Sequence, residues 1–264
     1  MIGISREIWD NISMITGGFF YHYLAFKYRR TLWRPFIRKV GGWLNGWEQK
    51  SLDLILVGPS AGYSLPPEFI YRYDRVIVIE KDPLAKWLFK KRFNQTNPIV
   101  VSEDLAATLP QMLNDYPDAD LVFCNVLGQV FIDWKQQGWS EKKFNQWKSQ
   151  LKELLKSRYW CSYHDLYSLR GKIDFIRDSE KFSKPVDVDD LIKSFATKFK
   201  MKSVDVVDHL THDLFLKGQR LVQHWQLTPQ SHFFIELIRS EDVGLGGYQK
   251  PSHLEKLMAT EHQI

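Results

Sequence analysis

Short apolar runs alternate with helical stretches from residue 52 to residue 238, and this alternation constrains the fold more than any other feature of the chain. The runs have the length and composition of buried parallel strands, and the stretches between them show helical periodicity. The expected strands are Leu52–Val57, Arg75–Glu80, Pro98–Ser102, Asp120–Asn125, Tyr159–Tyr163, Ser203–Val207 and His232–Ile238. The expected helices are Leu84–Phe93, Leu105–Asn114, Glu141–Lys156 and Asp189–Phe199.

This order predicts an α/β fold: a doubly wound, mostly parallel seven-stranded sheet with helices on both faces. No clear helix lies between the last two strands, so the last strand is expected to be antiparallel. We therefore expect a Rossmann-like domain over residues 51–240 and a tail over residues 241–264.

The first fifty residues differ from the rest in charge and in periodicity. They hold eight Lys and Arg against three Asp and Glu, which accounts for the whole net charge of +5. Apolar residues at helical spacing, then Phe19 to Trp33, then Pro35 at a first turn, predict three helices. Residues 1–50 are therefore expected to form an N-terminal helical, basic and aromatic cap.

Cysteine content and hydropathy bear on the compartment. Cys124 and Cys161 are the only cysteines, which is too few for a disulfide framework. No apolar run reaches the ~18 residues of a membrane span, and acidic residues near the start are untypical of a secretory signal. These features predict a soluble, cytoplasmic protein without a transmembrane segment.

Small, acidic and amide residues stand where the first four expected strands end. In doubly wound sheets, ligands bind at the carboxyl ends of the strands. Small residues there let a ligand approach the backbone, and a carboxylate can accept ribose hydroxyls or an adenine amino proton. The strand ends read Gly58-Pro59-Ser60-Ala61-Gly62, Glu80-Lys81-Asp82, Ser102-Glu103-Asp104-Leu105 and Cys124-Asn125-Val126.

In these motifs and their spacing, residues 52–238 resemble the class I S-adenosylmethionine-dependent methyltransferases. The resemblance implies S-adenosylmethionine (SAM) as cofactor and a transferase activity. It also implies that the Gly58–Gly62 loop wraps the methionine and ribose parts and that Glu80, with Lys81 and Asp82 beside it, holds the ribose. Asp104 and Leu105 would lie at the adenine, and Asn125 and Val126 would approach the methyl-donor side.

The chain departs from the family pattern at two positions. Leu56 stands where the family commonly has an acid, and Ser60 stands at the middle glycine. Leu56 cannot help to hold the methionine ammonium group. These departures keep a second hypothesis open, in which the chain is a non-catalytic methyltransferase-like protein that binds RNA or a protein partner.

Three rival interpretations share these residues. Gly58-x-Ser60-x-Gly62 also matches the nucleophile elbow of α/β-hydrolases, with Asp165 and then His209 or His212 in chain order, but Pro66-Pro67 argues against the helix that must follow. A nicotinamide site needs Gly-x-Gly-x-x-Gly, and two of its glycines are missing. His209 and His212 have the spacing of a metal-site fragment but no evident third ligand, so no metal is predicted.

The acceptor is not determined by the sequence and could be a small molecule, a lipid or RNA. His164, oriented by Asp165 at the end of the fifth strand, is a candidate general base for a hydroxyl acceptor. Lys27, Arg30, Arg34 and Arg38 fall at helical spacing and would form a basic stripe for nucleic acid or an anionic membrane. The alternative, which we favour, is that the aromatic residues of this segment pack on the sheet and close the pocket while its basic residues face water.

Overall fold

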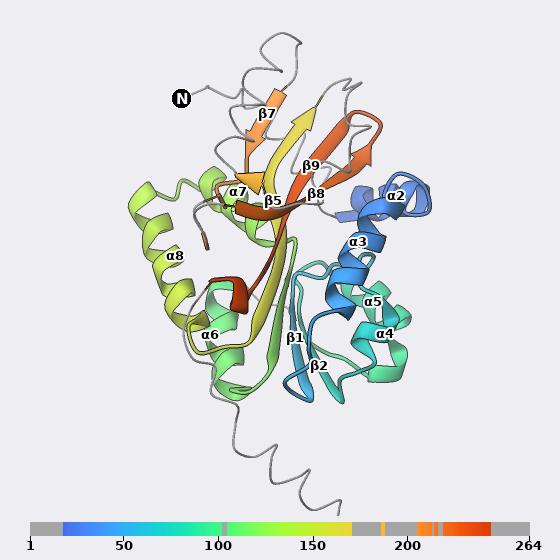
Figure 1. Cartoon of the computed structure of the whole chain (residues 1–264), viewed down its shortest axis with the longest axis vertical. Helices are drawn as coiled ribbons and strands as arrows, with labels where there is room; N and C mark the ends of the chain where they lie inside the picture. The colour runs from blue at the N-terminus through green and yellow to red at the C-terminus, as the bar shows by residue number, and fades with distance from the viewer. Residues whose placement is uncertain are drawn as a thin grey trace, which may run out of the picture.

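A single mixed sheet with helices on both sides forms the centre of the computed structural model (Figure 1). The structure describes residues 18–101, 105–170, 186–187, 205–212, 214–215 and 219–243. Its strands are β1 (Asp53–Val57), β2 (Arg75–Ile79), β3 (Ile99–Val101), β4 (Asp120–Cys124), β5 (Trp160–Arg170), β6 (Val186–Asp187), β7 (Asp205–Asp208), β8 (Gln219–Thr228) and β9 (Ser231–Arg239). The helices are α2 (Gly18–Tyr28), α3 (Arg34–Asn45), α4 (Pro67–Ile70), α5 (Pro83–Arg92), α6 (Leu105–Asp115), α7 (Leu127–Gln136) and α8 (Glu141–Leu155), with short 3-10 turns η1 (Asn94–Thr96) and η3 (Ser240–Val243).

The strand order is β3-β2-β1-β4-β5-β9-β8-β6. The first five strands pair in parallel, and β9 lies antiparallel between β5 and β8. The chain therefore winds outward from β1 to β3 and then returns to place β4 on the other side of β1. This arrangement confirms the expected doubly wound, mostly parallel sheet and its antiparallel last strand, and it puts the topological switch point between β1 and β4.

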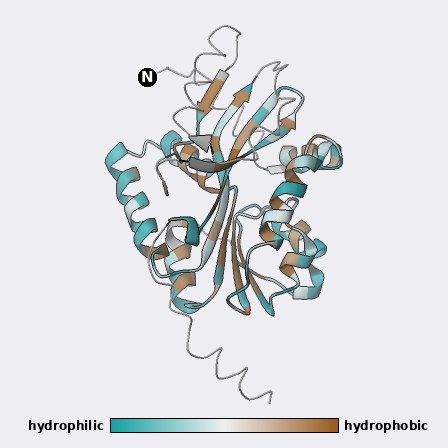
Figure 2. Cartoon of the chain, viewed as in Figure 1, coloured by the Kyte–Doolittle hydropathy of each residue, from teal (hydrophilic) through white to brown (hydrophobic). Residues whose placement is uncertain are grey.

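The continuous apolar runs of the inner strands are explained by burial on both faces of the sheet. Leu54 and Leu56 pack toward α2, α3, α4 and α5, whereas Ile55 and Val57 pack toward α6, α7 and α8. Figure 2 shows the central strands as predominantly hydrophobic. Because neither face meets water, alternation of polar and apolar residues is absent from these strands.

The helical segment at the amino end packs on the far part of the sheet. Trp33 is buried, and its indole Nε1 donates a hydrogen bond to the Leu227 carbonyl of β8 at 2.8 Å. The Phe36 ring stacks on Trp225, with centroids 5.0 Å apart. Trp33 and Phe36 are thus core residues, whereas Lys27, Arg30, Arg34 and Arg38 are exposed. Trp33 and Phe36 thus pack as the favoured prediction expects, whereas Phe19, Phe20, Tyr23 and Phe26 of the same segment are exposed, contrary to it.

Some elements differ from the sequence prediction. The strand expected at Ser203–Val207 is β7, and it pairs antiparallel with the outer half of β5 instead of joining the parallel set. The sequence pattern predicts no strand where β8 forms a hairpin with β9, and it predicts no helix where α7 lies. The helix expected at Asp189–Phe199 and the first of the three N-terminal helices lie outside the described residues. In the part of the chain that the structure describes, no helix is long and apolar enough to cross a membrane.

Candidate functional site

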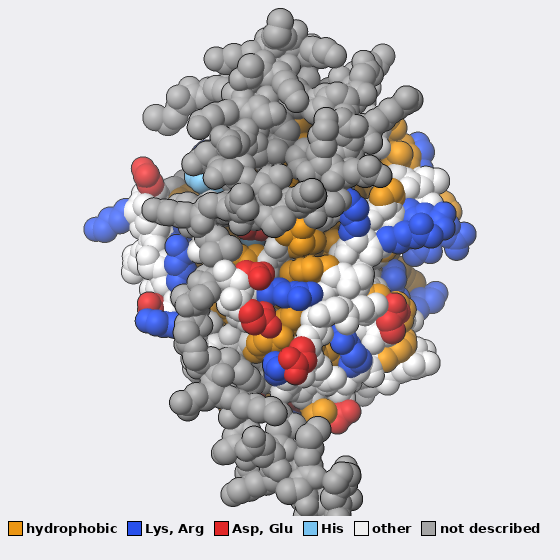
Figure 3. All heavy atoms as spheres, in the orientation of Figure 1, with side chains coloured by type: hydrophobic (Ala, Val, Ile, Leu, Met, Phe, Trp, Pro, Cys, Tyr) orange, Lys and Arg blue, Asp and Glu red, His pale blue; other side chains and the backbone are white. Residues whose placement is uncertain are grey.

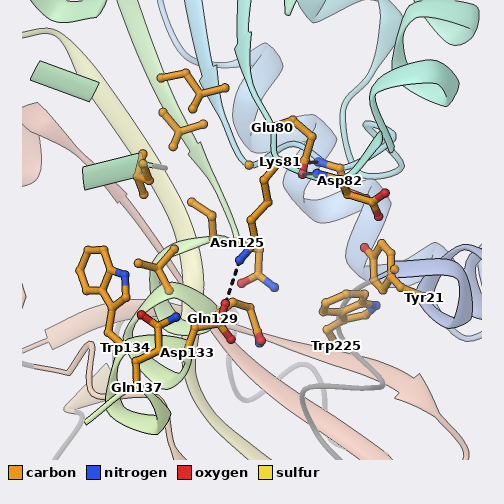
Figure 4. Close-up of a pocket in the computed structure, with 18 residues that line it drawn as sticks. Tyr21, Glu80, Lys81, Asp82, Asn125, Gln129, Asp133, Trp134, Gln137 and Trp225 are labelled. Atoms are coloured by element: carbon orange, nitrogen blue, oxygen red, sulfur yellow. Dashed lines mark hydrogen bonds and ion pairs between the residues drawn. The ribbon is translucent and has the colours of Figure 1, made fainter. Parts of the chain in front are cut away.

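A cavity of about 370 Å³ opens at the carboxyl ends of β1, β2 and β4, next to the switch point (Figure 4). This volume lies within the ~300–1,000 Å³ range of ligand pockets. Of the residues predicted from the sequence, the cavity is lined by Gly58, Ser60, Glu80, Lys81, Asp82, Leu105, Asn125 and Val126. Asp104 lies outside the described residues.

The loop after β1 reaches the cavity through its backbone. Gly58 has φ +61° and Ser60 has φ +52°, a left-handed conformation that costs little only for glycine. A side chain on Gly58 would collide with Val126, which lies between β4 and α7 and also lines the cavity. Pro59 and Gly62 do not line the cavity. Gly62 instead allows close packing, because a side chain there would meet the Phe93 ring at 2.5 Å.

Glu80, directly after β2, links the loop after β1 to the loop after β2 by hydrogen bonds. Its Oε2 accepts a hydrogen bond from the Ser60 backbone amide at 2.9 Å, and its Oε1 accepts one from the Asp82 amide at 2.9 Å. Burial raises the pKa of Glu80, and the backbone donors oppose that shift. The carboxylate is therefore held in a fixed position at the cavity wall.

The two residues after Glu80 connect β2 to other elements. Asp82 caps the amino end of α5 by accepting from the Leu84 amide at 2.8 Å. Its other oxygen lies 3.4 Å from His22 Nε2 of α2. Lys81 reaches across the cavity to Asp133 of α7, with Nζ and Oδ2 3.0 Å apart, as the dashed line in Figure 4 shows.

Asn125 follows β4 with φ +53°, and its backbone amide donates to the Tyr163 carbonyl at 2.7 Å. Its side-chain Oδ1 is buried without a hydrogen-bond partner, although the side chain lines the cavity. An unpartnered buried acceptor is costly in a folded protein unless a ligand or water satisfies it. The atom is thus available to a donor group on a bound molecule.

His164 and Asp165 lie behind the cavity wall, because β5 continues to Arg170 instead of ending at Tyr163. The predicted strand end is therefore a mid-strand position, and both side chains are fully buried and outside the cavity lining. His164 Nδ1 is 2.9 Å from Ser162 Oγ, and Nε2 is 3.1 Å from Glu236 Oε2. The structure does not bring His164 to the other predicted site residues.

Asp165 does not line the cavity itself, but it contacts Gln129, which does. Its Oδ2 accepts a hydrogen bond from Gln129 Nε2 at 3.3 Å. Burial raises the pKa of Asp165 to about 7 and lowers the pKa of the neighbouring His209 to about 4. Between these values both groups are neutral, so the 3.8 Å contact between His209 Nδ1 and Asp165 is not an ion pair in that range.

The rest of the lining comes from residues that the sequence prediction missed. In Figure 4, Trp134 and Gln137 lie on one side of the cavity and Tyr21 and Trp225 on the other. The α7 residues could have been found, since Leu127, Val130, Phe131 and Trp134 recur at helical spacing directly after a strand end. Nothing local marks Tyr21 or Trp225 as lining residues. The remaining members are Gly18, Val57, Ile79, Gln129, Val130 and Asp133.

The rival catalytic residues are engaged elsewhere. His209 Nε2 lies 3.0 Å from Ser168 Oγ and outside the cavity lining, so it is not placed as a base for Ser60. A turn, and not a helix, follows Ser60 directly. His212 Nδ1 lies 3.7 Å from Asp208. The structure thus offers the nucleophile elbow neither its helix nor its histidine.

No family model and no curated protein matches the chain. Among solved structures, the chain is similar to a DhpI complex with SAM and HEP at 11% identity and a TM-score of 0.39, covering 98% of this chain and 91% of that one. Magnesium protoporphyrin IX methyltransferase from Synechocystis PCC 6803 with bound SAH matches at 11% identity and a TM-score of 0.40, covering 89% and 95%. The 23S rRNA methyltransferase ErmE matches at 13% identity and 0.35, covering 86% and 74%. These likenesses are distant, and the fold rests on the chain's own strand order. By that order, the chain has the Rossmann-like fold to which class I methyltransferases belong.

Proposed function

We propose that the chain is a SAM-dependent methyltransferase and that the cavity holds the cofactor. One observation carries the proposal: Gly58, Glu80 and Asn125 come from the ends of three different strands, yet they line a single cavity at the switch point. Ligands of doubly wound sheets bind at this position. A small-residue loop, a carboxylate and an amide at these three ends match the parts of an adenosyl cofactor.

The residues present fit that group. The Glu80 carboxylate keeps acceptor capacity beyond its backbone hydrogen bonds, which suits a ribose hydroxyl. Leu105 and Ile79 supply apolar surface for an adenine ring, and Asn125 Oδ1 is free to accept from a donor such as an ammonium group. That last role would replace the missing acid, because Leu56 is fully buried within β1.

When bound, SAM supplies an electrophilic methyl group on a sulfonium centre. The chain's own contribution is to hold donor and acceptor in line, which is the main aid that a displacement of this kind needs. Gln129, Tyr21 and Trp225 also line the cavity and are not among the proposed cofactor residues, so we assign them to the acceptor side. The base role of His164 stays a prediction, and its buried position means that any proton path would run through neighbouring groups.

Equilibrium binding tests the proposal. We expect SAM and S-adenosylhomocysteine to bind the wild-type chain in a calorimetric titration, and we expect NAD not to compete. Glu80→Ala should weaken binding at least ~10-fold, which corresponds to ~1.4 kcal/mol, whereas Glu80→Asp should keep part of the affinity. Glu153→Ala, which removes an exposed carboxylate on α8, is the matched control and should bind as the wild type does.

Two outcomes would count against the proposal. If neither SAM nor S-adenosylhomocysteine binds, the non-catalytic alternative is favoured. Unchanged affinity in Glu80→Ala would remove the ribose assignment even if the cofactor binds.

A further inference from the structure

The outward face of α2 is lined with exposed aromatic rings. Phe19 is 78% exposed, Phe26 is 85% exposed, and Phe20 and Tyr23 are nearly half exposed. At ~100° per residue, these four side chains lie within about 120° of one another around the helix. Large apolar side chains clustered on one surface mark an interaction site far more often than scattered ones do.

This aromatic face is surrounded by positive charge. Residues 18–47 contain six Lys and Arg and no Asp or Glu. Lys27 lies within the aromatic arc of α2, and Arg30 follows the helix; both are exposed. Figure 3 shows Lys and Arg side chains gathered beside hydrophobic ones on the side of the molecule where α2 and α5 lie.

The neighbouring helix α5 also carries an exposed aromatic ring beside cations. It contacts α2 and exposes Trp87, with Lys91 Nζ 5.2 Å from the centre of the indole ring. The last turn of α5 is basic throughout, with Lys90, Lys91 and Arg92. Two adjacent helices thus present aromatic rings and cations together.

We propose that this aromatic and basic face of α2 and α5 docks on an anionic lipid bilayer. Exposed rings of this size fit the boundary between headgroups and acyl chains, and cations beside them fit anionic headgroups. Single-stranded nucleic acid is bound by rings that line a groove. Here the rings stand on the outward side of a helix, which suits a broad apolar layer better than a strand of bases.

Docking in this way would place the cavity next to the bilayer. Gly18 and Tyr21 of α2 line the cavity, and His22 of the same helix contacts Tyr63 and Asp82 beside it. The same helix therefore has one face toward the lipid and the other toward the site. The docking proposal does not depend on which ligand the cavity holds.

Co-sedimentation with vesicles tests the proposal. We expect the full chain to bind vesicles of phosphatidylcholine with added phosphatidylserine, and to bind pure phosphatidylcholine vesicles much less. Raising the salt concentration should weaken binding, because it screens the cationic contribution. Phe19→Ser with Phe26→Ser should lower vesicle affinity about 10-fold or more, since the two most exposed rings are lost. Lys27→Gln with Arg30→Gln should weaken the preference for phosphatidylserine, since the cations of α5 remain.

The matched control is Leu52→Ser with Ile99→Ser, which removes two exposed apolar side chains outside α2 and α5, one directly before β1 and one on the edge strand β3. It should bind vesicles as the wild type does, and unchanged melting temperatures should show that all variants are folded. The proposal is wrong if the wild type does not sediment with anionic vesicles. It is also wrong if the Phe19 and Phe26 variant binds as well as the control, or if the chain binds single-stranded RNA and no vesicles.

Discussion

Gly58 and Gly138 both have positive φ, but only Gly58 is crowded. Gly58 has φ +61°, and a side chain there would collide with Val126; Gly138 has φ +80° and open space around it. Gly138→Ala should therefore cost only backbone strain, about 1 kcal/mol of unfolding free energy. Gly58→Ala adds overpacking and should cost about 3 kcal/mol or more. Urea unfolding of the two variants measures the difference, and equal losses would mean that Gly58 and Val126 are not in contact.

Asp165 should make the stability of the chain depend on pH. Its pKa is raised from a usual value of ~3.9 to about 7. Between those values the folded chain keeps a proton that the unfolded chain has lost, so stability falls as pH rises through this window. His209 has the opposite effect, because burial lowers its pKa to about 4. As pH falls below the usual value of ~6.5, the unfolded chain takes up a proton that the folded chain does not, so stability falls with falling pH.

Replacement of Asp165 by Asn removes the first effect. The stability of Asp165→Asn relative to the wild type should increase between about pH 5 and pH 8, by on the order of 3 kcal/mol. Asp118→Asn changes an exposed carboxyl and should leave the pH dependence as it is. A pH-independent difference between Asp165→Asn and the wild type would show that Asp165 is ionised throughout.

Individual site residues were predictable where they end a parallel strand. Glu80 and Asn125 line the cavity as expected, because the end of a strand fixes a residue's position in this fold. His164 and Asp165 were placed less well, since their burial depends on β9 running antiparallel beside them and on the length of β5. Neither property is visible from the residues next to them.

At the scale of elements, the contact between α3 and β8 holds the amino-terminal helices on the sheet. Trp33 is buried, donates to the Leu227 carbonyl and packs edge-on against Trp225 at 5.2 Å. Trp33→Ala should cost about 3–5 kcal/mol of unfolding free energy, as expected for a buried aromatic residue. Trp87→Ala removes a side chain that is 58% exposed and should cost about 0.5 kcal/mol. Similar values for the two would contradict the placement of α3.

The elements differ in how far local sequence determines them. The strands β1, β2 and β4 were predictable because burial on both faces leaves continuous apolar runs. The strand β8 was missed because polar residues such as Gln223 and His224 interrupt its apolar pattern, although Gln223 is buried in the structure. Its conformation depends on pairing with β9, which the residues of β8 alone do not reveal.

At the scale of the whole molecule, charge and site are divided between two parts. The net charge of +5 lies in the first fifty residues, whereas the strand-end residues of the cavity lie in the remainder, whose formal net charge is zero. The two parts meet at the cavity, where Tyr21 of α2 faces a wall made by β1, β2 and β4. We therefore propose that the sheet binds the cofactor and that α2 forms one wall of the site.

The most direct test of this account is a crystal structure of the chain grown with saturating S-adenosylhomocysteine. We predict density for the ligand in the cavity between Gly58, Glu80 and Asn125, with a ribose hydroxyl within hydrogen-bonding distance of the Glu80 carboxylate. A ligand bound elsewhere on the chain, or a cavity that stays without ligand at saturation, would contradict the central claim.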